Sequence, residues 1–583
     1  MAMPDSGANA PPSASAMSAF SRPVLLALMV ALAVGWFTSL GYRDLIRPDE
    51  GRYAEIAREM VASGDWLTPR LNDFKYFEKP ALQYWATAAA FSSFGISEWT
   101  ARLWAALTGF AGILLVGFTG LRLFGRDAGL YAAAVTASSF LYVFIAHANT
   151  LDMGLTFFLT AAVCAFVLAQ HDGQGPAGRR NWMLAAWAAA ALAVLSKGLI
   201  GLLLPGGALF WYIVIQRDWR RIPLLHLPAG IALFLAITAP WFIAVSLKNP
   251  EFFQFFFIQE HFERFLTKGH GRYQPPWYFI PVLLAGMVPW TLTMLPAVAR
   301  AWRAEAGHFQ TARFLLLWCV FTFVFFSASG SKLASYILPI FPALALLCGR
   351  YLATAGRRAL LWQVLPFSLA GIAIMLLAPS ITRRGNAELP AELLADYVPW
   401  LVLTGAALLG GALLFALFEA RGRRAAAVIA LSACGLASAL LPLSGHNTLA
   451  SVYSAKQIVQ KIRPQLRPDT PFYVVNTFDH TLLFYLGRTV TMVSYKDELA
   501  VAIGWEKHKF LPDYTSFARA WEKDSAPLAM FAPKDLTDFR KQFPVAMVEI
   551  ARDPRRVIVA KPPAHPAAHP AAHPPANPQA KTP

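Results

Sequence analysis

Ionisable residues gather in a short polar stretch, residues 47–53, which directly follows the first apolar segment of the chain. Within it, the carboxylates of Asp49 and Glu50 are adjacent, and one glycine separates them from Arg52. Ionisable groups at the edge of a bilayer's hydrocarbon region are costly and mark functional sites by default. A carboxylate pair beside an arginine can bind an anionic group and control charge at a reacting centre. A solvated loop that merely follows a membrane anchor is the alternative interpretation.

Five further segments carry side chains that could do chemistry, and the predicted topology brings all of them to one face of the membrane. Lysine and arginine at the level of lipid headgroups match a phosphate. A phosphate attached to a long apolar chain would lie with its chain between membrane helices and its head among these side chains. We therefore expect a site for a lipid-carried phosphate. The residues are Tyr76, Glu78 and Lys79; His147, Asn149 and Asp152; Lys197; His261, Glu263, Arg264, Lys268 and His270; and Ser331, Lys332 and Tyr336.

The composition is that of a polytopic membrane protein. Of the 583 residues, 56% are hydrophobic and 15% are charged, whereas a soluble domain has about 25% charged residues. Apolar runs near the ~20 residues that cross a bilayer recur along most of the chain. We expect thirteen spans, the first of which is a retained helix rather than a removed signal. They lie near residues 23–42, 99–121, 128–146, 151–170, 182–196, 199–216, 224–246, 277–298, 313–328, 333–350, 359–379, 398–419 and 425–443.

The distribution of arginine predicts the orientation. The net charge of +17 does not indicate nucleic acid, because many arginines lie in short clusters between apolar runs, in one set of alternate loops. Positively charged loops of this kind stay in the cytoplasm. The tail at 1–22 is therefore predicted to be cytoplasmic, and the odd number of spans places everything after the last span outside. The four cysteines lie inside apolar runs and show neither metal-ligand nor disulfide spacing.

The predicted domains follow from this topology. A transmembrane domain at 23–445 carries two long outer loops, 43–98 and 247–276, and the first of them contains a helix that is expected to lie in the interface. Residues 446–561 alternate short helical and strand patterns, which indicates a small periplasmic α/β domain. The tail at 562–583 is rich in Pro, Ala and His and is expected to be disordered. The expected fold class is thus mostly α.

The loops predicted to face the cytoplasm lack one feature of enzymes that use soluble nucleotide sugars. Such an enzyme should have a cytoplasmic nucleotide-binding domain, but the sequence shows no glycine-rich phosphate loop of that kind. The inner loops contain mainly arginine clusters, which topology alone explains. A lipid-carried phosphate donor, used at the outer face, is the economical interpretation.

Several longer motifs carry a resemblance to one family of membrane enzymes. They are RPDEGRYAEIAREM (47–60), SGDWLTPRLNDFKYFEKPALQYW (63–85), LDMGLTFF (151–158), LSKGLIG (195–201) and SGSKLASYILPIFP (329–342). On these motifs the chain resembles the bacterial aminoarabinose transferases, which modify lipid A. That family belongs to the GT-C class of polyprenyl-phosphate-dependent glycosyltransferases and is akin to protein O-mannosyltransferases. The resemblance covers about residues 20–445 and is weakest in the carboxy-terminal part, from which no functional residue is carried over.

The resemblance implies an inverting glycosyltransferase of the bacterial inner membrane, with a GT-C-like fold and an active site at the periplasmic face. It would transfer 4-amino-4-deoxy-L-arabinose from undecaprenyl phosphate to phosphate groups of lipid A and confer resistance to polymyxin and cationic antimicrobial peptides. The implied partners are the lipid-linked sugar donor, the lipid A acceptor and the membrane, with no nucleic acid.

Two alternatives stay open. Other GT-C transferases, which pass a hexose to a protein or glycan, share most of the motifs. A transporter or flippase should carry polar residues near the middle of the membrane and often shows repeat symmetry. Here the polar residues cluster at one predicted face and no internal repeat is visible, which disfavours a transporter.

The resemblance also implies roles for particular residues. Asp49 is the candidate catalytic carboxylate, either as a general base or as a group that orients the acceptor phosphate and stabilises positive charge on the sugar. Lys79 and Arg264 are the candidates for binding the donor phosphate. Three further residues are expected to assist them, namely Arg52, Lys332 and Tyr336.

Other residues have two candidate roles each. Asp152 would bind the amino group of the sugar or fix a neighbouring cation. Lys197 would contact an acceptor phosphate or form a structural ion pair. The remaining candidates would touch substrate or support the site, and they are Glu50, Tyr53, Tyr76 and Glu78.

No cofactor is expected to be required. The open alternative is a divalent metal, structural rather than catalytic, held by Glu78 with His261 or His270. A carboxylate with imidazoles is a ligand set that suits zinc. The three residues follow no fixed metal-binding spacing.

Overall fold

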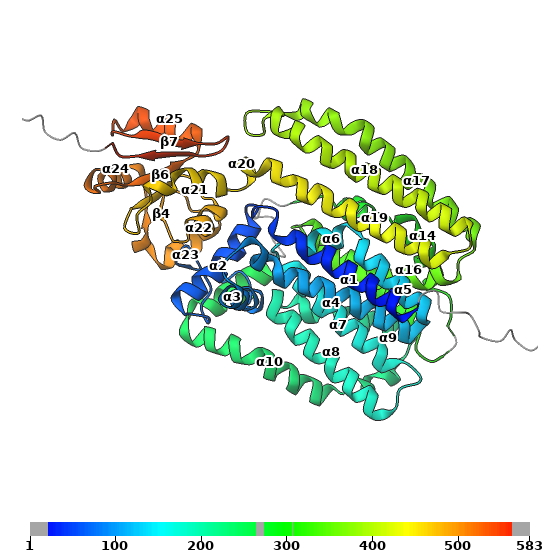
Figure 1. The fold of residues 1–583 in the computed structure, drawn as a ribbon. Coiled ribbons are helices and arrows are strands. Elements are labelled where there is room, and N and C mark those ends of the chain that lie inside the picture. Colours follow the sequence, from blue (N-terminus) through cyan, green and yellow to red (C-terminus); the bar gives the residue numbers. More distant parts are fainter. Residues whose placement is uncertain (1–20, 264–272, 306, 563–583) are drawn as a thin grey trace, which may run out of the picture.

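A bundle of long helices adjoins a small domain that contains a β-sheet (Figure 1). The computed structural model describes residues 21–263, 273–305 and 307–562. The predicted class, a mostly α polytopic membrane protein with a small carboxy-terminal α/β domain, is confirmed.

Nine helical segments in the described ranges are long and apolar enough to cross a membrane. The number rises to eleven if each of two bent helix pairs is one span. One pair is α5 (Arg126–Ser138) with α6 (Phe140–Ala146), bent by 63°, and the other is η4 and α13 (Pro276–Gly286) with α14 (Thr291–Ala301), bent by 113°. The nine segments are α1 (Arg22–Thr38) with η1 (Ser39–Gly41), α4 (Glu98–Phe124), α7 (Leu151–Gln170), α10 (Leu227–Lys248), α15 (Thr311–Ala328), η5 (Ala334–Ile340) with α16 (Phe341–Thr354), α17 (Arg357–Leu377) with η6 (Ala378–Arg384), α18 (Ala391–Ala420), and α19 (Arg424–Gly445) with η7 (His446–Leu449) and α20 (Ala450–Tyr453).

Helices α8 (Pro176–Lys197) and α9 (Ile200–Gln216) cover the two remaining predicted spans. The start of α8 is polar, because it contains Arg179 and Arg180, and α9 has 17 residues, fewer than the ~20 of a typical span. Every predicted span thus corresponds to helical structure. The predicted number of thirteen is not confirmed, since length and composition support nine to eleven spans within the described ranges.

Small residues let the membrane helices pack closely. A Cβ added at Gly349 in α16 would lie 2.4 Å from the carbonyl oxygen of Ala128 in α5. A Cβ at Gly129 in α5 would lie 2.5 Å from the backbone nitrogen of Leu121 in α4. Helices in a membrane associate by van der Waals packing, because lipid tails are as apolar as the side chains. These backbone contacts therefore hold α4, α5 and α16 together.

The first long loop, residues 43–98, is largely folded. Helix α2 has two acidic residues in its first turn, where the helix dipole favours negative charge. It ends at Ser63 and is capped by Gly64, whose φ of +71° is a conformation that favours glycine. Residues 50–60 of α2 are all buried, because the helix lies between the membrane helices and the carboxy-terminal domain (Figure 1). The elements of the loop are α2 (Asp49–Ser63), β1 (Arg70–Leu71), β2 (Phe74–Lys75) and α3 (Leu82–Phe94).

One hydrophobic core joins α2 to the carboxy-terminal domain. Ile56 of α2 belongs to the same buried cluster as Leu482 and Met492 of the domain. A Cβ added at Gly51 would lie 2.7 Å from the backbone nitrogen of Thr481. Only glycine allows this close approach, so the start of α2 packs directly against the backbone of the domain at Thr481.

The carboxy-terminal domain is a six-stranded sheet with the strand order β5-β4-β3-β6-β8-β7. Strands β5, β4, β3 and β6 run parallel to one another, and β8 and β7 are antiparallel to their neighbours. Val474 faces the core that α21, α22 and α23 share with α2, and Val475 faces the core under α24 and α25. The elements are α21 (Lys456–Ile462), β3 (Phe472–Val475), α22 (His480–Leu486), β4 (Thr491–Val493), α23 (Ala500–Trp505), β5 (Phe510–Leu511), α24 (Tyr514–Lys523), β6 (Leu528–Phe531), α25 (Pro533–Gln542), β7 (Val548–Arg552) and β8 (Val557–Ala560).

The second long loop packs against the first. It begins with α11 (Glu251–Phe253) and the π-helical segment η3 (Gln254–Glu263). Phe252 and Phe256 are fully buried, and their ring centroids lie 5.2 Å apart. Phe252 also meets Phe77 of the first loop edge-on at 5.2 Å. The two long loops therefore pack against each other and share one hydrophobic cluster.

Candidate active site

Asp49 is the first residue of α2, and its carboxylate is accessible. Its side chain is 41% exposed, and its Oδ1 accepts a hydrogen bond from Nη1 of Arg52 at 3.2 Å. Arg52 lies three residues further on in the same helix, and only 6% of its side chain is exposed. The start of α2 therefore presents a carboxylate with a buried guanidinium behind it.

Glu50 occupies the opposite environment. Its carboxylate is buried between two arginines, with 2.6 Å to Arg43 and 2.7 Å to Arg102. The backbone N–H groups of Ile46 and Asn149 donate to the same carboxylate at 2.9 and 3.1 Å. Burial opposes ionisation, but the charges and hydrogen bonds of the two arginines outweigh it and hold the pKa of Glu50 well below its usual range. Protein groups occupy both oxygens, so the geometry favours the supporting role that the sequence left open for Glu50.

This buried cluster joins three parts of the chain. Arg102 comes from α4 and is 1% exposed, and it also donates to the carbonyls of Leu40 and Arg43 at 2.7 and 2.6 Å. Arg43 donates to the carbonyl of His147 at 3.1 Å. His147, which the sequence grouped with the candidate site, is thus part of the support beneath α2. The cluster ties the start of α2 to the ends of the membrane helices.

Asp152, Lys197 and Tyr336 form a second group of candidate site residues. Asp152 lies in the first turn of α7 and pairs with Lys197, the last residue of α8, through a short hydrogen bond. The ammonium group of Lys197 lies 4.8 Å from the centroid of the Tyr336 ring, a distance typical of a cation–π contact. The charge of Asp49 also acts on Lys197. The ammonium group of Lys197 is therefore paired with Asp152 and also feels the charge of Asp49.

Buried tyrosines surround the start of α2. Tyr53 and Tyr84 have ring centroids 6.1 Å apart. The hydroxyl groups of Tyr76 and Tyr84 are buried and have no hydrogen-bond partner among the described residues. Burial, together with the charge of Asp49 for Tyr53 and of Glu78 for Tyr76, raises the pKa of both tyrosines well above its usual value. These hydroxyls therefore stay neutral, and a buried hydroxyl without a partner calls for an explanation such as an absent ligand or water.

Glu78 and Lys79 are half-buried and close to these tyrosines. The charge of Glu78 acts on Tyr53, Tyr76 and Tyr84. The ammonium group of Lys79 donates to the carbonyl of Glu78 at 2.6 Å. The motif at 76–79 thus contributes a carboxylate and a cation to the same region as Asp49.

The carboxy-terminal domain supplies a residue that the sequence did not single out. Glu498 forms a salt bridge with Arg52 at 2.6 Å, and its other oxygen pairs with Nε2 of His480. His480 is the first residue of α22, the helix that Gly51 approaches. A chain of charged groups therefore runs from the domain through Arg52 to Asp49. No spacing rule could reveal it, because the partners lie at opposite ends of the sequence.

Other candidates are not joined to Asp49 by any contact of the described residues. Lys332 is buried, and its ammonium group donates to the carbonyls of Gln274, at 2.9 Å, and Ser329. It therefore ties the start of η5 to the end of the second long loop. The side chain of His261, and all of Arg264 and His270, lie outside the described residues.

The predicted metal site can be compared with the structure only within the described residues. No group of three or more His, Cys, Asp or Glu residues that could hold a metal ion is found in the ranges that the structure describes. The predicted set of Glu78, His261 and His270 falls largely outside these ranges. It therefore stays a prediction.

Two family models match this sequence. The model of the aminoarabinose transferase C-terminal domain matches residues 458–561. The model of dolichyl-phosphate-mannose-protein mannosyltransferase matches residues 23–256, which include Asp49, Asp152 and Lys197. Together they span the helix bundle's first half and the sheet domain.

Named relatives match over long stretches. The undecaprenyl phosphate-alpha-4-amino-4-deoxy-L-arabinose arabinosyl transferase 2 of Sodalis glossinidius (strain morsitans) is 35% identical over 454 residues, which are 76% of this chain and 80% of the relative. The arabinosyl transferase of Erwinia tasmaniensis is 34% identical over 332 residues, which are 56% of this chain and 60% of that relative.

Solved structures agree with the sequence comparison. The crystal structure of ArnT from Cupriavidus metallidurans bound to undecaprenyl phosphate matches with a TM-score of 0.87 and 37% identity, and covers 94% of this chain and 100% of that chain. The same protein in the apo state matches with a TM-score of 0.86. The chain therefore belongs to the family of undecaprenyl phosphate-4-amino-4-deoxy-L-arabinose arabinosyl transferases.

Proposed function

We propose that the chain is an integral membrane glycosyltransferase that transfers 4-amino-4-deoxy-L-arabinose from undecaprenyl phosphate to phosphate groups of lipid A. One observation carries the proposal. A chain that matches a relative bound to undecaprenyl phosphate over 94% of its length presents an accessible carboxylate, Asp49, which pairs with Arg52 and whose charge also acts on Lys197. We place the protein in the bacterial inner membrane, with its amino terminus in the cytoplasm and its site and carboxy-terminal domain in the periplasm.

The proposed reaction exchanges one phosphate for another at the anomeric carbon. The bond between that carbon and the donor phosphate oxygen breaks, and undecaprenyl phosphate leaves with the electron pair. A lipid A phosphate oxygen forms the new bond from the opposite face, so the configuration inverts. The acceptor loses one negative charge and the donor phosphate gains one. No net proton transfer is needed when the acceptor phosphate is already ionised.

Asp49 is the proposed catalytic carboxylate. Because the acceptor needs little deprotonation, its main role is to position the acceptor and to stabilise the positive charge that develops on the sugar. A carboxylate suits that task when water is partly excluded and its orientation is fixed. The salt bridges of Arg52 to Asp49 and Glu498 and the burial of the neighbouring Glu50 support such a fixed orientation.

Cations are needed where the leaving phosphate gains charge. We propose Lys79 and Arg264 for this role, with Arg52 nearby. Lys332 would act indirectly, since its donors are engaged with backbone carbonyls. Tyr336 would hold Lys197 through its ring.

The amino group of the sugar needs a carboxylate of its own. Asp152 is the proposed partner, because its carboxylate already pairs with an ammonium group, that of Lys197, on which the charge of Asp49 also acts. The proposed product carries an extra positive charge on lipid A. Lower negative charge at the outer surface weakens the binding of polymyxin and other cationic antimicrobial peptides, which accounts for the proposed resistance.

The experiment compares lipid A from cells that lack the protein with lipid A from cells that express it. Mass spectrometry should show an increment of one aminopentose only when the protein is present, and purified protein supplied with the lipid-linked aminopentose should produce the same increment. A hexose on protein or glycan, with lipid A unchanged, would instead support the alternative GT-C transfer and refute this proposal.

A further inference from the structure

Two exposed arginines stand in a loop where the predicted topology does not call for them. Arg383 and Arg384 are the last two residues of η6, and both are exposed. The topology puts the loop that follows η6 outside, and the other short loops on that side contain no arginine. Positive charge orients a membrane protein from its cytoplasmic loops. This pair therefore needs a cause other than orientation.

A salt bridge places the loop after η6 against the carboxy-terminal domain. The loop is compact, because a Cβ added at Gly385 would lie 2.8 Å from the Cβ of Ala391 in α18. Glu388 of the loop pairs at 3.2 Å with Arg555, which lies in the turn between β7 and β8. Figure 1 shows the connection between α17 and α18 beside the edge of the sheet that β7 forms. The exposed arginine pair therefore adjoins the sheet domain.

Arg47 extends this positive charge toward the candidate active site. It is half-buried, and its side chain forms no hydrogen bond or salt bridge with another residue that the structure describes. The charges of Arg555 and Arg556 act on its guanidinium group, as does that of Asp479. Arg47 precedes Asp49 by two residues, so their Cα atoms are at most about 7 Å apart.

The carboxylates around Arg47 are already engaged with another arginine. The Oδ2 atom of Asp479 accepts from Nε of Arg556 at 2.8 Å, and its Oδ1 atom accepts from the backbone N–H of Thr481 at 2.9 Å. Asp553 pairs with Arg556 at 2.7 Å. The two carboxylates thus balance the buried Arg556, and Arg47 keeps its donors for an anion from outside the chain.

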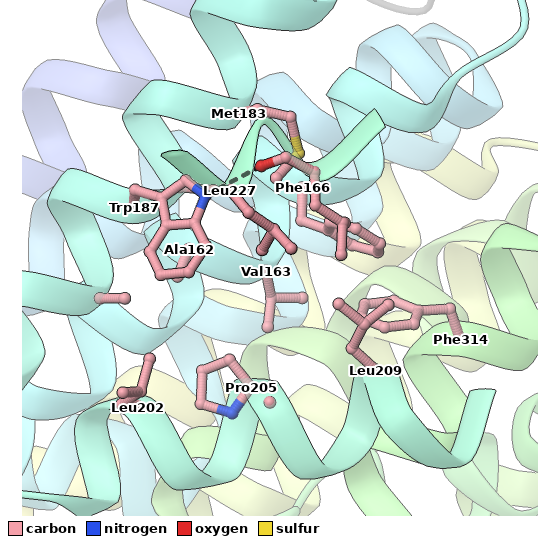
Figure 2. A pocket seen from close by; sticks show the side chains of 14 residues that line it. Ala162, Val163, Phe166, Met183, Trp187, Leu202, Pro205, Leu209, Leu227 and Phe314 are labelled. Carbon is pink, nitrogen blue, oxygen red and sulfur yellow. Dashed lines mark hydrogen bonds between the residues drawn. The ribbon is translucent and has the colours of Figure 1, made fainter. Parts of the chain in front are cut away.

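The cavity inside the helix bundle does not suit such an anion. It has a volume of about 240 Å³, and α7, α8, α9 and α15 contribute to its walls (Figure 2). All fourteen lining residues are apolar. A phosphate there would be buried without a partner for its charge, which is strongly unfavourable. A charged head group is therefore expected at the surface of the bundle, where the arginines lie.

We propose that four arginines bind the phosphate group of the lipid A acceptor that is not being modified. This arginine surface consists of Arg47, Arg383, Arg384 and Arg555. The proposal rests on the proposed function, which makes the acceptor a lipid with two phosphate groups. Only one of them can lie beside Asp49 at a time, so the other needs a place of its own at the depth of the head groups. Arginine suits it, because the guanidinium group donates two parallel hydrogen bonds to a phosphate.

The arginine surface is distinct from the residues proposed for the donor. The donor phosphate is assigned to Lys79 and Arg264, which belong to the two long loops. The arginine surface instead lies where residues 43–48, the loop after η6 and the turn between β7 and β8 meet. Binding of the second phosphate there would orient the acceptor with its reacting phosphate toward Asp49.

The test removes charge from the arginine surface and phosphate from the acceptor. One variant combines Arg383→Gln with Arg384→Gln, and a second is Arg47→Gln. The matched control combines Arg540→Gln with Lys541→Gln, since these are also adjacent cations in the last turn of a helix, α25. The purified full-length proteins are assayed with lipid A that carries two phosphate groups and with lipid A that carries one.

For the acceptor with two phosphate groups, KM should rise about tenfold in both surface variants, because charge-assisted hydrogen bonds to one phosphate are lost. KM for the acceptor with one phosphate group, KM for the donor and all values for the control should stay unchanged. Equilibrium binding of both forms of lipid A without donor should show the same contrast. An unmodified protein that binds lipid A in this way but transfers no aminopentose would contradict the proposed function and still support the arginine surface.

Four outcomes would overturn the proposal. An equal rise in KM for both acceptors would show that the arginine surface does not recognise the second phosphate. Unchanged KM in both surface variants would show that it does not bind the acceptor. An equal rise in the control would indicate a general effect of net charge. An equal loss of binding to vesicles that contain phosphatidylglycerol would assign the arginine surface to anionic lipids in general.

Discussion

Asp49 and Glu50 are adjacent carboxylates with opposite surroundings. Glu50 is 4% exposed and is held by two arginines and two backbone N–H groups. The Asp49 side chain is 41% exposed and accepts a hydrogen bond from Arg52, which also forms a salt bridge with Glu498 of the carboxy-terminal domain. Successive residues of a helix point about 100° apart, so the first turn of α2 can bury one carboxylate and present the next.

The two environments indicate a structural role for Glu50 and a catalytic role for Asp49. A buried carboxylate whose lone pairs are all satisfied has nothing left for a ligand, but its loss strands the charges around it. An accessible carboxylate contributes little to stability and keeps its lone pairs for substrate. Substitution of Glu50 should therefore mainly affect folding, and substitution of Asp49 should mainly affect the rate of transfer.

The largest effect on stability is expected from Glu50→Gln. It leaves Arg43 and Arg102 without a counter-charge, which should reduce the free energy of unfolding by roughly 3–5 kcal/mol. Thermal unfolding in detergent measures the loss. The control is Glu388→Gln, because Glu388 is 71% exposed in its pair with Arg555 and such pairs contribute about 0–1 kcal/mol. Equal melting temperatures for the two variants would contradict the supporting role of Glu50.

The next effect tests how the domain is docked on α2. Gly51→Ala places a Cβ 2.7 Å from the backbone of Thr481, and overpacking of this kind costs about 1–3 kcal/mol. We expect a lower melting temperature and faster proteolysis of the carboxy-terminal domain. Gly504→Ala in α23, where the added Cβ meets no atom within 4 Å, should change neither. If both variants behave like the unmodified protein, α2 and α22 are not in close contact.

A smaller effect is expected from Glu498→Gln. The amide keeps a hydrogen bond to Arg52 but removes the charge, so Arg52 is held less firmly beside Asp49. Transfer should fall about tenfold, a loss typical of a weakened positioning contact, while the melting temperature stays close to that of the unmodified protein. Glu549→Gln, in a surface pair with Arg552 of the same domain, serves as control. Unchanged kcat/KM in the Glu498 variant would show that the carboxy-terminal domain does not contribute to the active site through Glu498.

The smallest expected effect is that of metal removal. Extensive treatment with a chelator should leave the rate of transfer unchanged, because the proposed mechanism assigns each charge to a side chain. A loss of activity that added zinc restores would revive the set of Glu78, His261 and His270 as a required metal site.

Hydropathy was sufficient to find the helix bundle, because membrane helices are read from long apolar runs. It was not sufficient for α2, where Glu50, Glu55 and Glu59 are buried although their residue type predicts exposure. Two of the partners of Glu50, Arg102 of α4 and the backbone N–H of Asn149, become visible only when distant segments meet. Local patterns therefore predict which elements form, and not which of their charges are covered.

In the candidate site too, local motifs reveal some residues and not others. Asp49, Asp152 and Lys197 could be chosen from motifs in order along the chain, and in the structure Asp152 pairs with Lys197, on which the charge of Asp49 also acts. Glu498 and His480 lie in a domain whose sequence carries no comparable motif. They are placed by the sheet domain's docking on α2, which depends on a glycine and a shared core.

The most direct test of the account is the rate of sugar transfer by purified Asp49→Asn. The matched control is Asp538→Asn, since the Asp538 side chain is 47% exposed and is also paired with a cation three residues later, Lys541. We expect Asp49→Asn to fold normally and to transfer the sugar about 10³-fold more slowly, with the control unaffected. A folded Asp49→Asn variant that transfers aminopentose to lipid A at the rate of the control would contradict the central claim.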